Sequence, residues 1–212
     1  MLQVKSFEFN PIQENTYILY NAFNDCAIID PGCYAEEERQ EMVDFIESHQ
    51  LKPKWLLNTH CHLDHVFGNK FIAGKYNLKL QIHPGEQIVL DAAVTSGLMF
   101  NLPFDNYQGE IEFLQPGSSI QMGEDRLDIL FTPGHSPASL SFYHAAAGFV
   151  LSGDALFYRS IGRTDLPGGN LDVLLNSIRT TLFTLPADTR VYSGHGPVTR
   201  IGDEIKYNPY LQ

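Results

Sequence analysis

The chain has 212 residues, of which 43% are hydrophobic and 18% are charged, so it holds enough apolar material for the core of a globular protein. Its formal net charge of −11 disfavours a nucleic-acid-binding protein, because such a protein needs a basic surface. The sequence has no apolar run of about 18 residues and no apolar signal segment. We therefore predict one cytoplasmic domain over residues 1–212, with no nucleic-acid or membrane partner.

The first half of the sequence alternates short strands with helices. Strands are predicted where apolar or alternating runs are bounded by turn residues, at 2–9, 15–20, 25–30, 54–57 and 78–82. Helices are predicted where apolar residues recur at helical spacing, at 36–49, 63–76 and 86–93. Residues 94–116 lose this periodicity and are rich in aromatics, Gly, Pro and Asn, which leaves a surface loop and a wall of a substrate cleft as equal alternatives.

The second half repeats this organisation. Strands are predicted at 120–122, 126–131, 139–144, 148–152 and 190–193, and a helix at 171–185. Strands precede helices in both halves, which favours two mixed sheets packed face to face with helices outside. The predicted fold class is α/β, with an αββα sandwich.

Four candidate metal ligands, His60, His62, Asp64 and His65, directly follow an apolar strand. Side chains alternate along an extended segment, so His60 and His62 point the same way, and a helix starting near residue 63 turns Asp64 and His65 toward them. This pattern supplies half of each of two metal sites. Cys61 is predicted to face away as a small buried residue, and the three cysteines form an odd, sparse set typical of reduced intracellular thiols.

Three further candidate ligands, His135, Asp154 and His195, also follow strand-like segments. Each has a glycine beside it, which allows a sharp turn at a crowded centre. Turns do not require histidine, so the repeated placement of these residues after apolar strands indicates a metal centre.

Together these segments resemble the signature motifs of the metallo-β-lactamase superfamily: His60-x-His62-x-Asp64-His65, Pro133-Gly134-His135, Gly153-Asp154 and Gly194-His195-Gly196. Residues 162–165 (GRTD) and the tail 193–211 are most similar to single-domain glyoxalase II-like hydrolases, and residues 30–32 (DPG) resemble an early turn of the superfamily. The resemblance implies an αββα sandwich with two metal ions at one edge.

The resemblance also assigns the ligands. One metal would be held by His60, His62 and His135, the other by Asp64, His65 and His195, with Asp154 as the bridge. The two carboxylates, Asp64 and Asp154, are the predicted catalytic residues. These nitrogen and oxygen donors suit zinc, and also iron or manganese. A water or hydroxide between the two ions would be the nucleophile.

Other polar residues leave alternatives open. Asp30 either orients a ligand or the His60 turn, or is structural in its own turn. Arg163 either binds an anionic substrate or pairs with Asp165, and Arg159 has the same two interpretations. The remaining singled-out residues are predicted to be structural or exposed histidines and core tyrosines: His49, His83, His144, Tyr207 and Tyr210.

The resemblance implies hydrolysis of thioesters, with S-D-lactoylglutathione as the reference substrate. Two-domain glyoxalase II has a C-terminal helical region that helps to bind glutathione, whereas this sequence continues for only 17 residues after His195, so another small thiol could replace glutathione. The main alternative is a mononuclear iron persulfide dioxygenase, which shares the THCH and GRTD patterns. The non-enzymatic alternative is a binding module that is stabilised by metal and has no catalytic activity.

Overall fold

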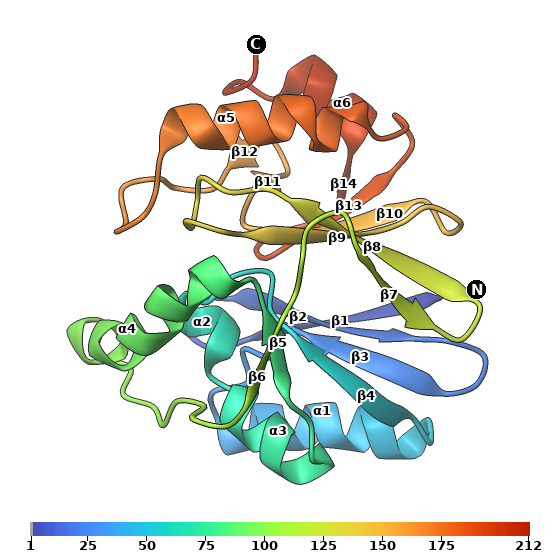
Figure 1. Cartoon of the computed structure of the whole chain (residues 1–212), viewed down its shortest axis with the longest axis vertical. Helices are drawn as coiled ribbons and strands as arrows, with labels where there is room; N and C mark the ends of the chain where they lie inside the picture. The colour runs from blue at the N-terminus through green and yellow to red at the C-terminus, as the bar shows by residue number, and fades with distance from the viewer. Residues whose placement is uncertain (1) are drawn as a thin grey trace.

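Two six-stranded β-sheets form the centre of the structure, a computed structural model that describes residues 2–212 (Figure 1). The N-terminal sheet has the order β1-β2-β3-β4-β5-β6, with strands Gln3–Phe9, Glu14–Tyr20, Asp25–Ile29, Lys52–Leu57, Leu80–Ile82 and Ile111–Phe113. The C-terminal sheet has the order β14-β13-β10-β9-β8-β7, with strands Thr199–Arg200, Arg190–Ser193, Phe149–Gly153, Leu140–His144, Asp125–Phe131 and Ser119–Met122. A small hairpin pairs β11 with β12, Leu156–Phe157 with Ser160–Ile161.

Both large sheets are mixed, as the sequence predicts. In the first sheet β1, β2 and β3 pair antiparallel, whereas β3 to β6 run parallel. In the second sheet only β10 and β13 pair in parallel. Parallel neighbours require crossover connections, and helices supply several of them.

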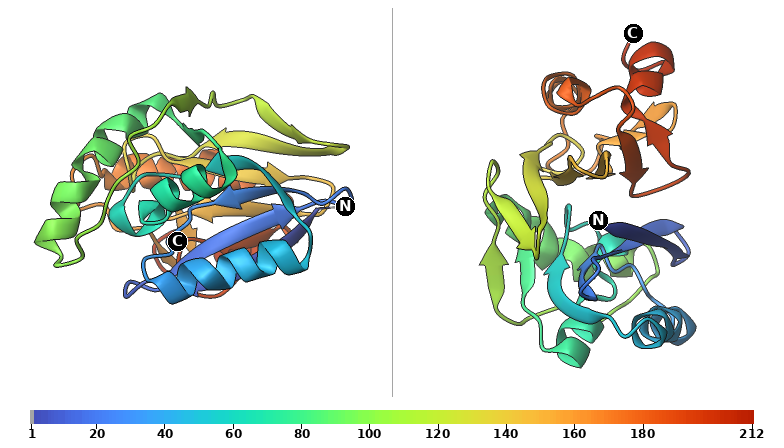
Figure 2. Two further views of the ribbon diagram at one scale, coloured as in Figure 1. Left: turned by 90° about the horizontal axis from the view of Figure 1, so that it is seen from below. Right: turned by 90° about the vertical axis from the view of Figure 1, so that its right-hand side faces the viewer.

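Helices cover the outer faces of the two sheets, and the views in Figure 2 place them on opposite sides of the sandwich. The first sheet carries α1 Glu36–Ser48, α2 Leu63–Val66, α3 Asn69–Tyr76 and, after the short 3₁₀ turn Pro84–Glu86, α4 Gln87–Met99. The second sheet carries α5 Leu171–Thr180, the 3₁₀ turn Leu182–Thr184 and α6 Ile201–Tyr207. The layers therefore follow the predicted αββα order. No helix within residues 2–212 is long and apolar enough to span a bilayer.

Strands β2 and β3 show why the central segments are almost continuously apolar. Ile18 and Ile28 pack with the helices on the outer face, whereas Leu19 and Ile29 pack between the two sheets. Because successive side chains point to opposite faces and both faces are covered, all positions of these two strands except Tyr20 and Asp25 at their ends are buried.

The predicted single helix over 63–76 is wrong, because the chain breaks into α2 and α3 at Gly68. A continuous helix would bond the Gly68 amide to the Asp64 carbonyl, four residues back. Instead the Gly68 amide donates to the Pro31 carbonyl (N···O 2.7 Å), and the Asp64 carbonyl accepts from the Asn10 side chain (3.1 Å). The break leaves α2 as one short turn that aims its side chains at the sheet edge.

Other boundaries also differ from the prediction. Helix α4 runs to Met99 rather than residue 93, so part of 94–116 is helical, and the predicted helix over 171–185 ends at Thr180. The short strands β6, β11, β12 and β14 and helix α6 were not predicted. The prediction that Tyr207 and Tyr210 pack in the core is wrong, since these side chains are 50% and 56% exposed.

Candidate metal centre

Four strands end at the edge of the sandwich where the predicted ligands lie. Strand β4 leads to the His60 motif, β8 to His135, β10 to Asp154 and β13 to His195. Helix α2 begins at Leu63 and adds two further candidate ligands, Asp64 and His65. The structure thus brings all seven predicted ligand residues to one small volume: His60, His62, Asp64, His65, His135, Asp154 and His195.

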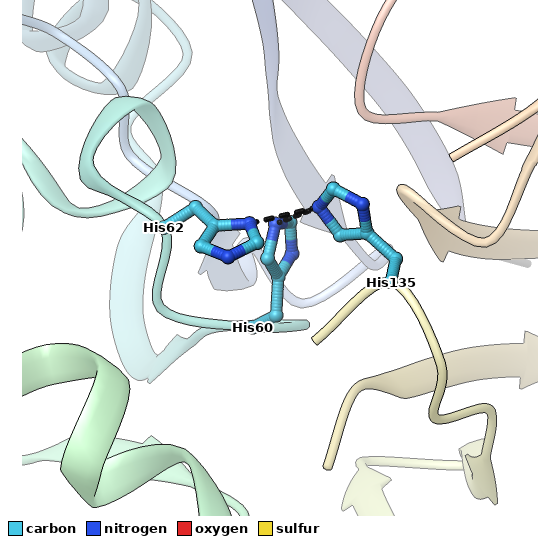
Figure 3. Close-up of side chains that lie close together, drawn as sticks. All are labelled: His60, His62 and His135. Atoms are coloured by element: carbon cyan, nitrogen blue, oxygen red, sulfur yellow. Dashed lines mark hydrogen bonds between the residues drawn. The ribbon is translucent and has the colours of Figure 1, made fainter. Parts of the chain in front are cut away.

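The first cluster consists of three histidines whose ring nitrogens converge (Figure 3). His135 Nε2 lies 2.8 Å from His62 Nδ1 and 3.2 Å from His60 Nε2. Ligand nitrogens at tetrahedral zinc, with bonds of about 2.0–2.1 Å, lie about 3.4 Å apart. The cluster therefore has nearly the spacing of three corners of such a site.

Hydrogen bonds on the far side of two rings identify their free nitrogens. His135 Nδ1 lies 2.8 Å from the Arg163 carbonyl, which can only accept, so Nδ1 carries the proton. The Thr59 hydroxyl donates to Asp30 Oδ2 (2.6 Å), so it accepts from His60 Nδ1 at 3.0 Å. Both Nε2 atoms then present lone pairs to each other, an arrangement that a cation between them stabilises.

The second cluster consists of Asp64, His65 and His195. Asp64 Oδ2 lies 3.1 Å from His195 Nε2 and 3.7 Å from His65 Nε2. His195 Nδ1 donates to the Gln13 carbonyl (3.0 Å), which directs its Nε2 at the Asp64 carboxylate. The Asn15 amide next to this contact donates to the Gly194 carbonyl (2.7 Å), which ties the β1–β2 turn to the end of β13.

Asp154 lies between the two clusters. Its Oδ2 is 3.4 Å from His135 Nε2, and its Oδ1 is 3.4 Å from His65 Nε2. Oδ1 and His65 Nε2 are buried, and neither has a hydrogen-bond partner among the described residues. Buried polar atoms are rarely left unpaired, so this pair fits metal ligation and matches a bridging carboxylate.

The ionisation states of these groups suit metal binding. Burial lowers the pKa of His60, and it lowers the pKa of His62 to about 3, with help from neighbouring histidines. Burial opposes ionisation of Asp154 and Asp64, but the adjacent histidines, His65 above all, hold the pKa of each carboxyl below its usual value. Metal ions bind neutral imidazole and ionised carboxylate, and the fold favours these forms at His60, His62, Asp64 and Asp154. Burial opposes a charge on His65 and His195, but the neighbouring carboxylates Asp154 and Asp64 raise the pKa of both, so a bound cation would take the place of a proton on these two rings.

Gly194 marks the closest approach of backbone to this centre. A Cβ on this residue would lie 2.0 Å from Asp154 Oδ1 and 2.7 Å from His65 Cε1. Any side chain would displace these two groups, so glycine is required by the space rather than by the turn.

Asp30 supports the centre from behind. Its carboxylate accepts from the Thr59 amide (2.7 Å), the Thr59 hydroxyl (2.6 Å) and the Asn58 side chain (3.1 Å), and its Oδ2 lies 3.2 Å from His65 Nδ1. Although Asp30 groups spatially with His60 and His65, these bonds already occupy its oxygens. Of the two alternatives, the structure favours the one in which Asp30 orients the His60 turn.

Two buried carboxylates of this support were missed in the sequence. Glu14 is fully buried. Its Oε1 lies 3.8 Å from His65 Nδ1 and has no hydrogen-bond partner among the described residues. Glu86 accepts from the Cys61 amide (2.9 Å), the Ser136 hydroxyl (2.5 Å) and the Ala138 amide (2.8 Å). Glu86 therefore joins the His60–His62 loop to the His135 turn.

The spacing of buried positions along a strand or a helix could have identified both residues. Glu14 shares a strand face with Thr16 and Ile18, and Glu86 lies four residues before Leu90 on the buried side of α4. A charged residue on a face that is otherwise buried indicates a partner inside the protein.

The remaining polar candidates lie away from the cluster of ligand atoms. Arg163 pairs with Asp165 through two N···O contacts of 2.7 Å, while its exposed side chain also lines the cavity over the centre. Arg159 donates to the Asp203 carbonyl and lies over the Tyr207 ring, so it is structural. The other histidines behave as predicted: His49 is exposed, His83 caps the Pro84–Glu86 turn and His144 is buried against Asp125. Cys61 is buried, as predicted.

Glu86→Gln should weaken metal binding by up to about tenfold, because one hydrogen-bonded link between the two histidine loops is lost. Competition with a chromophoric chelator measures this affinity. Glu37→Gln, an exposed position on α1, is the matched control and should bind metal as the unmodified protein does. Equal affinities in the two variants would show that Glu86 does not position the ligands.

A model of the metallo-beta-lactamase superfamily matches residues 9–195. The chain belongs to this superfamily. It is 38% identical over 203 residues to the probable metallo-hydrolase YqgX of Bacillus subtilis, covering 95% of this chain and 93% of the relative. It is 31% identical to the hydroxyacylglutathione hydrolase GloC of Haemophilus influenzae, covering 99% and 98% of the two chains. The chain is thus a member of a metallo-hydrolase superfamily.

Solved structures agree on the fold. The crystal structure of the BLEG-1 B3 metallo-beta-lactamase has a TM-score of 0.91 and 35% identity, covering 99% of this chain and 100% of that one. The di-iron-bound form of TTHA1623 has a TM-score of 0.87 and 32% identity, covering 98% and 100%. ETHE1 from Myxococcus xanthus has a TM-score of 0.77 and 27% identity, covering 98% and 83%. The predicted metallo-β-lactamase fold is confirmed.

Proposed function

We propose that this chain hydrolyses thioesters at a centre of two divalent metal ions. The observation that carries the proposal is the position of Asp154, which contacts His135 of the first cluster and His65 of the second. Two complete ligand sets that share a carboxylate suit a dinuclear hydrolase.

The candidate ligands can be divided into one set for each of two metal ions. His60, His62 and His135 would bind one ion, and Asp64, His65 and His195 the other. The two ions would supply Lewis acidity that lowers the pKa of water and polarises the substrate carbonyl. We propose zinc, with iron or manganese as alternatives, and the di-iron form of the similar TTHA1623 structure makes iron a specific competitor.

Thioesters suit this centre because of their leaving group. Hydrolysis forms a C–O bond with the oxygen of water and breaks the C–S bond, and the sulfur departs with the electron pair. A thiol has a pKa of about 8.5, so the thiolate leaves and takes a proton from solvent without a dedicated acid. The similarity to GloC, named a hydroxyacylglutathione hydrolase, supports the same reaction class.

The alternative is a persulfide dioxygenase with one iron, because the Thr59–His62 and Gly162–Asp165 patterns occur in both classes. An oxygenase needs a redox-active metal with open positions and does not need the second cluster. Zinc has no redox chemistry, so it separates the two reactions.

The zinc-loaded protein should hydrolyse a panel of acyl thioesters and consume no oxygen with glutathione persulfide. One preparation, loaded in turn with zinc and iron, is assayed for thioester hydrolysis, oxygen uptake and, given the similarity to BLEG-1, cleavage of a β-lactam. Iron-dependent oxygen uptake without hydrolysis of any thioester would contradict the proposal, as would β-lactam cleavage alone.

A further inference from the structure

An apolar cavity of about 370 Å³ lies beside the candidate metal centre. Ile88 and Ala92 of α4 form one wall, and Leu166 and Pro167 form the other. No Asp, Glu, Lys or Arg side chain of the described residues lines it, and it ends at His62. In Figure 1, α4 projects from the same end of the sandwich as α2.

This cavity adjoins a second one, of about 470 Å³, that lies over the centre itself. The two share His62, Leu63, Phe100 and Leu166 as lining residues. The second cavity is lined by members of both clusters, His62 and His135 of the first and Asp64 and His195 of the second, and it extends to Arg163. The two cavities therefore form two arms of one cleft. The arm beneath α4, called the apolar arm, has no charged lining residue within residues 2–212, whereas the arm toward Arg163 is lined by Asp64, Asp154 and Arg163 as well as by apolar residues.

The walls of the apolar arm stay apolar where solvent reaches them. Ile88 is 72% exposed and Phe100 is 54% exposed, and both line the cavity. Exposed apolar side chains that gather around a cavity beside a reactive centre are typical of a ligand-binding groove.

We propose that the apolar arm binds the acyl chain of the substrate, so that the enzyme prefers thioesters of medium-length apolar acids. This inference rests on the proposed function. A thioester carbonyl at the centre directs its acyl group into one arm and its thiol into the other. The charged groups of a small natural thiol would lose hydration in the apolar arm, so the thiol lies toward Arg163.

The size of the arm sets the chain length. A cavity of 370 Å³ equals about twelve water molecules at about 30 Å³ each, and a methylene group is of similar size. A chain of up to about twelve carbons therefore fits. Each methylene that leaves water should raise kcat/KM about fourfold.

The test uses zinc-loaded protein and acetyl, butyryl and hexanoyl thioesters of one thiol, N-acetylcysteamine. We expect kcat/KM to rise by at least about tenfold from acetyl to hexanoyl. Ala92→Phe fills the arm and should abolish this preference. Thr95→Phe, on the same helix and exposed but outside the cavity, is the matched control and should keep it.

Ketone analogues in which CH₂ replaces the sulfur separate this inference from the proposed function. Their affinities, measured by calorimetry on the same proteins, should rise with chain length and lose that rise in Ala92→Phe. If no thioester is hydrolysed but the ketones follow this pattern, the proposed function fails and the acyl arm stands. Efficient hydrolysis with flat kcat/KM, or ketone affinities that do not depend on chain length, would overturn the acyl arm.

Discussion

Asp154→Ala should reduce kcat for thioester hydrolysis by about 10³-fold or more and lower the metal content to about one ion per chain. The carboxylate contacts both clusters, so its loss opens one side of each proposed site at once. Lewis-acid stabilisation by a metal is worth several kcal/mol, and each 1.36 kcal/mol is about a factor of ten in rate. Elemental analysis of the purified variant and steady-state kinetics make the two measurements.

The matched control is Asp44→Ala, an exposed aspartate on α1 that contacts only Gln40 in the described hydrogen bonds. It should keep both ions and the full rate. Two tightly held ions per Asp154→Ala chain, with a rate near that of the control, would refute the bridging role of this carboxylate.

Removal of the metal ions should abolish hydrolysis while the fold remains. The three apolar clusters lie between the sheets and beneath the helices, and none of them contains a proposed ligand. Burial opposes a charge on His65, but Asp154 and Asp64 raise its pKa well above the usual value. In the metal-free protein a protonated His65 therefore offsets part of the negative charge that the ions would otherwise balance.

The expected loss of stability follows from mass action. Each ion present at about 1,000 times its dissociation constant stabilises the folded state by about 4 kcal/mol, so removal of two such ions should lower the free energy of unfolding by up to about 8 kcal/mol. Urea titrations followed by far-UV circular dichroism, before chelation and after reloading with zinc, measure this difference. A chelated protein that is unfolded at room temperature without urea would show that the metal is needed for folding.

The sequence predicts well which polar residues converge, because His60, His135, Asp154 and His195 each come soon after the end of an apolar strand, and strand ends meet at a sheet edge. The residues that position the candidate ligands through hydrogen bonds are harder to predict from the sequence. Glu86 finds its three donors in two loops that come from other parts of the chain, and Arg163 positions His135 through a backbone carbonyl. A contact made by a backbone carbonyl does not depend on the side chain of its residue, so the pattern of side chains in the sequence cannot predict it.

Two predicted helix boundaries were wrong, each for a physical reason. The break at Gly68 depends on a tertiary bond to Pro31, which local periodicity does not contain. The extension of α4 was missed because Leu98 and Met99 are 65% and 81% exposed, so its last turn has no buried stripe for periodicity to detect.

The contact between the β1–β2 turn and His195 bears on how the protein acquires its centre. His195 Nδ1 and the Gln13 carbonyl are 182 positions apart in sequence, and the Asn15 side chain joins the same region through the Ser193 and Gly196 carbonyls. Contacts of such long range close large loops and form late in folding. On the ribosome, the N-terminal sheet can pair long before β13 emerges. The second cluster of candidate ligands is therefore completed only after nearly all of the chain has been synthesised, so a nascent chain can gather His60 and His62 early but not the complete proposed centre.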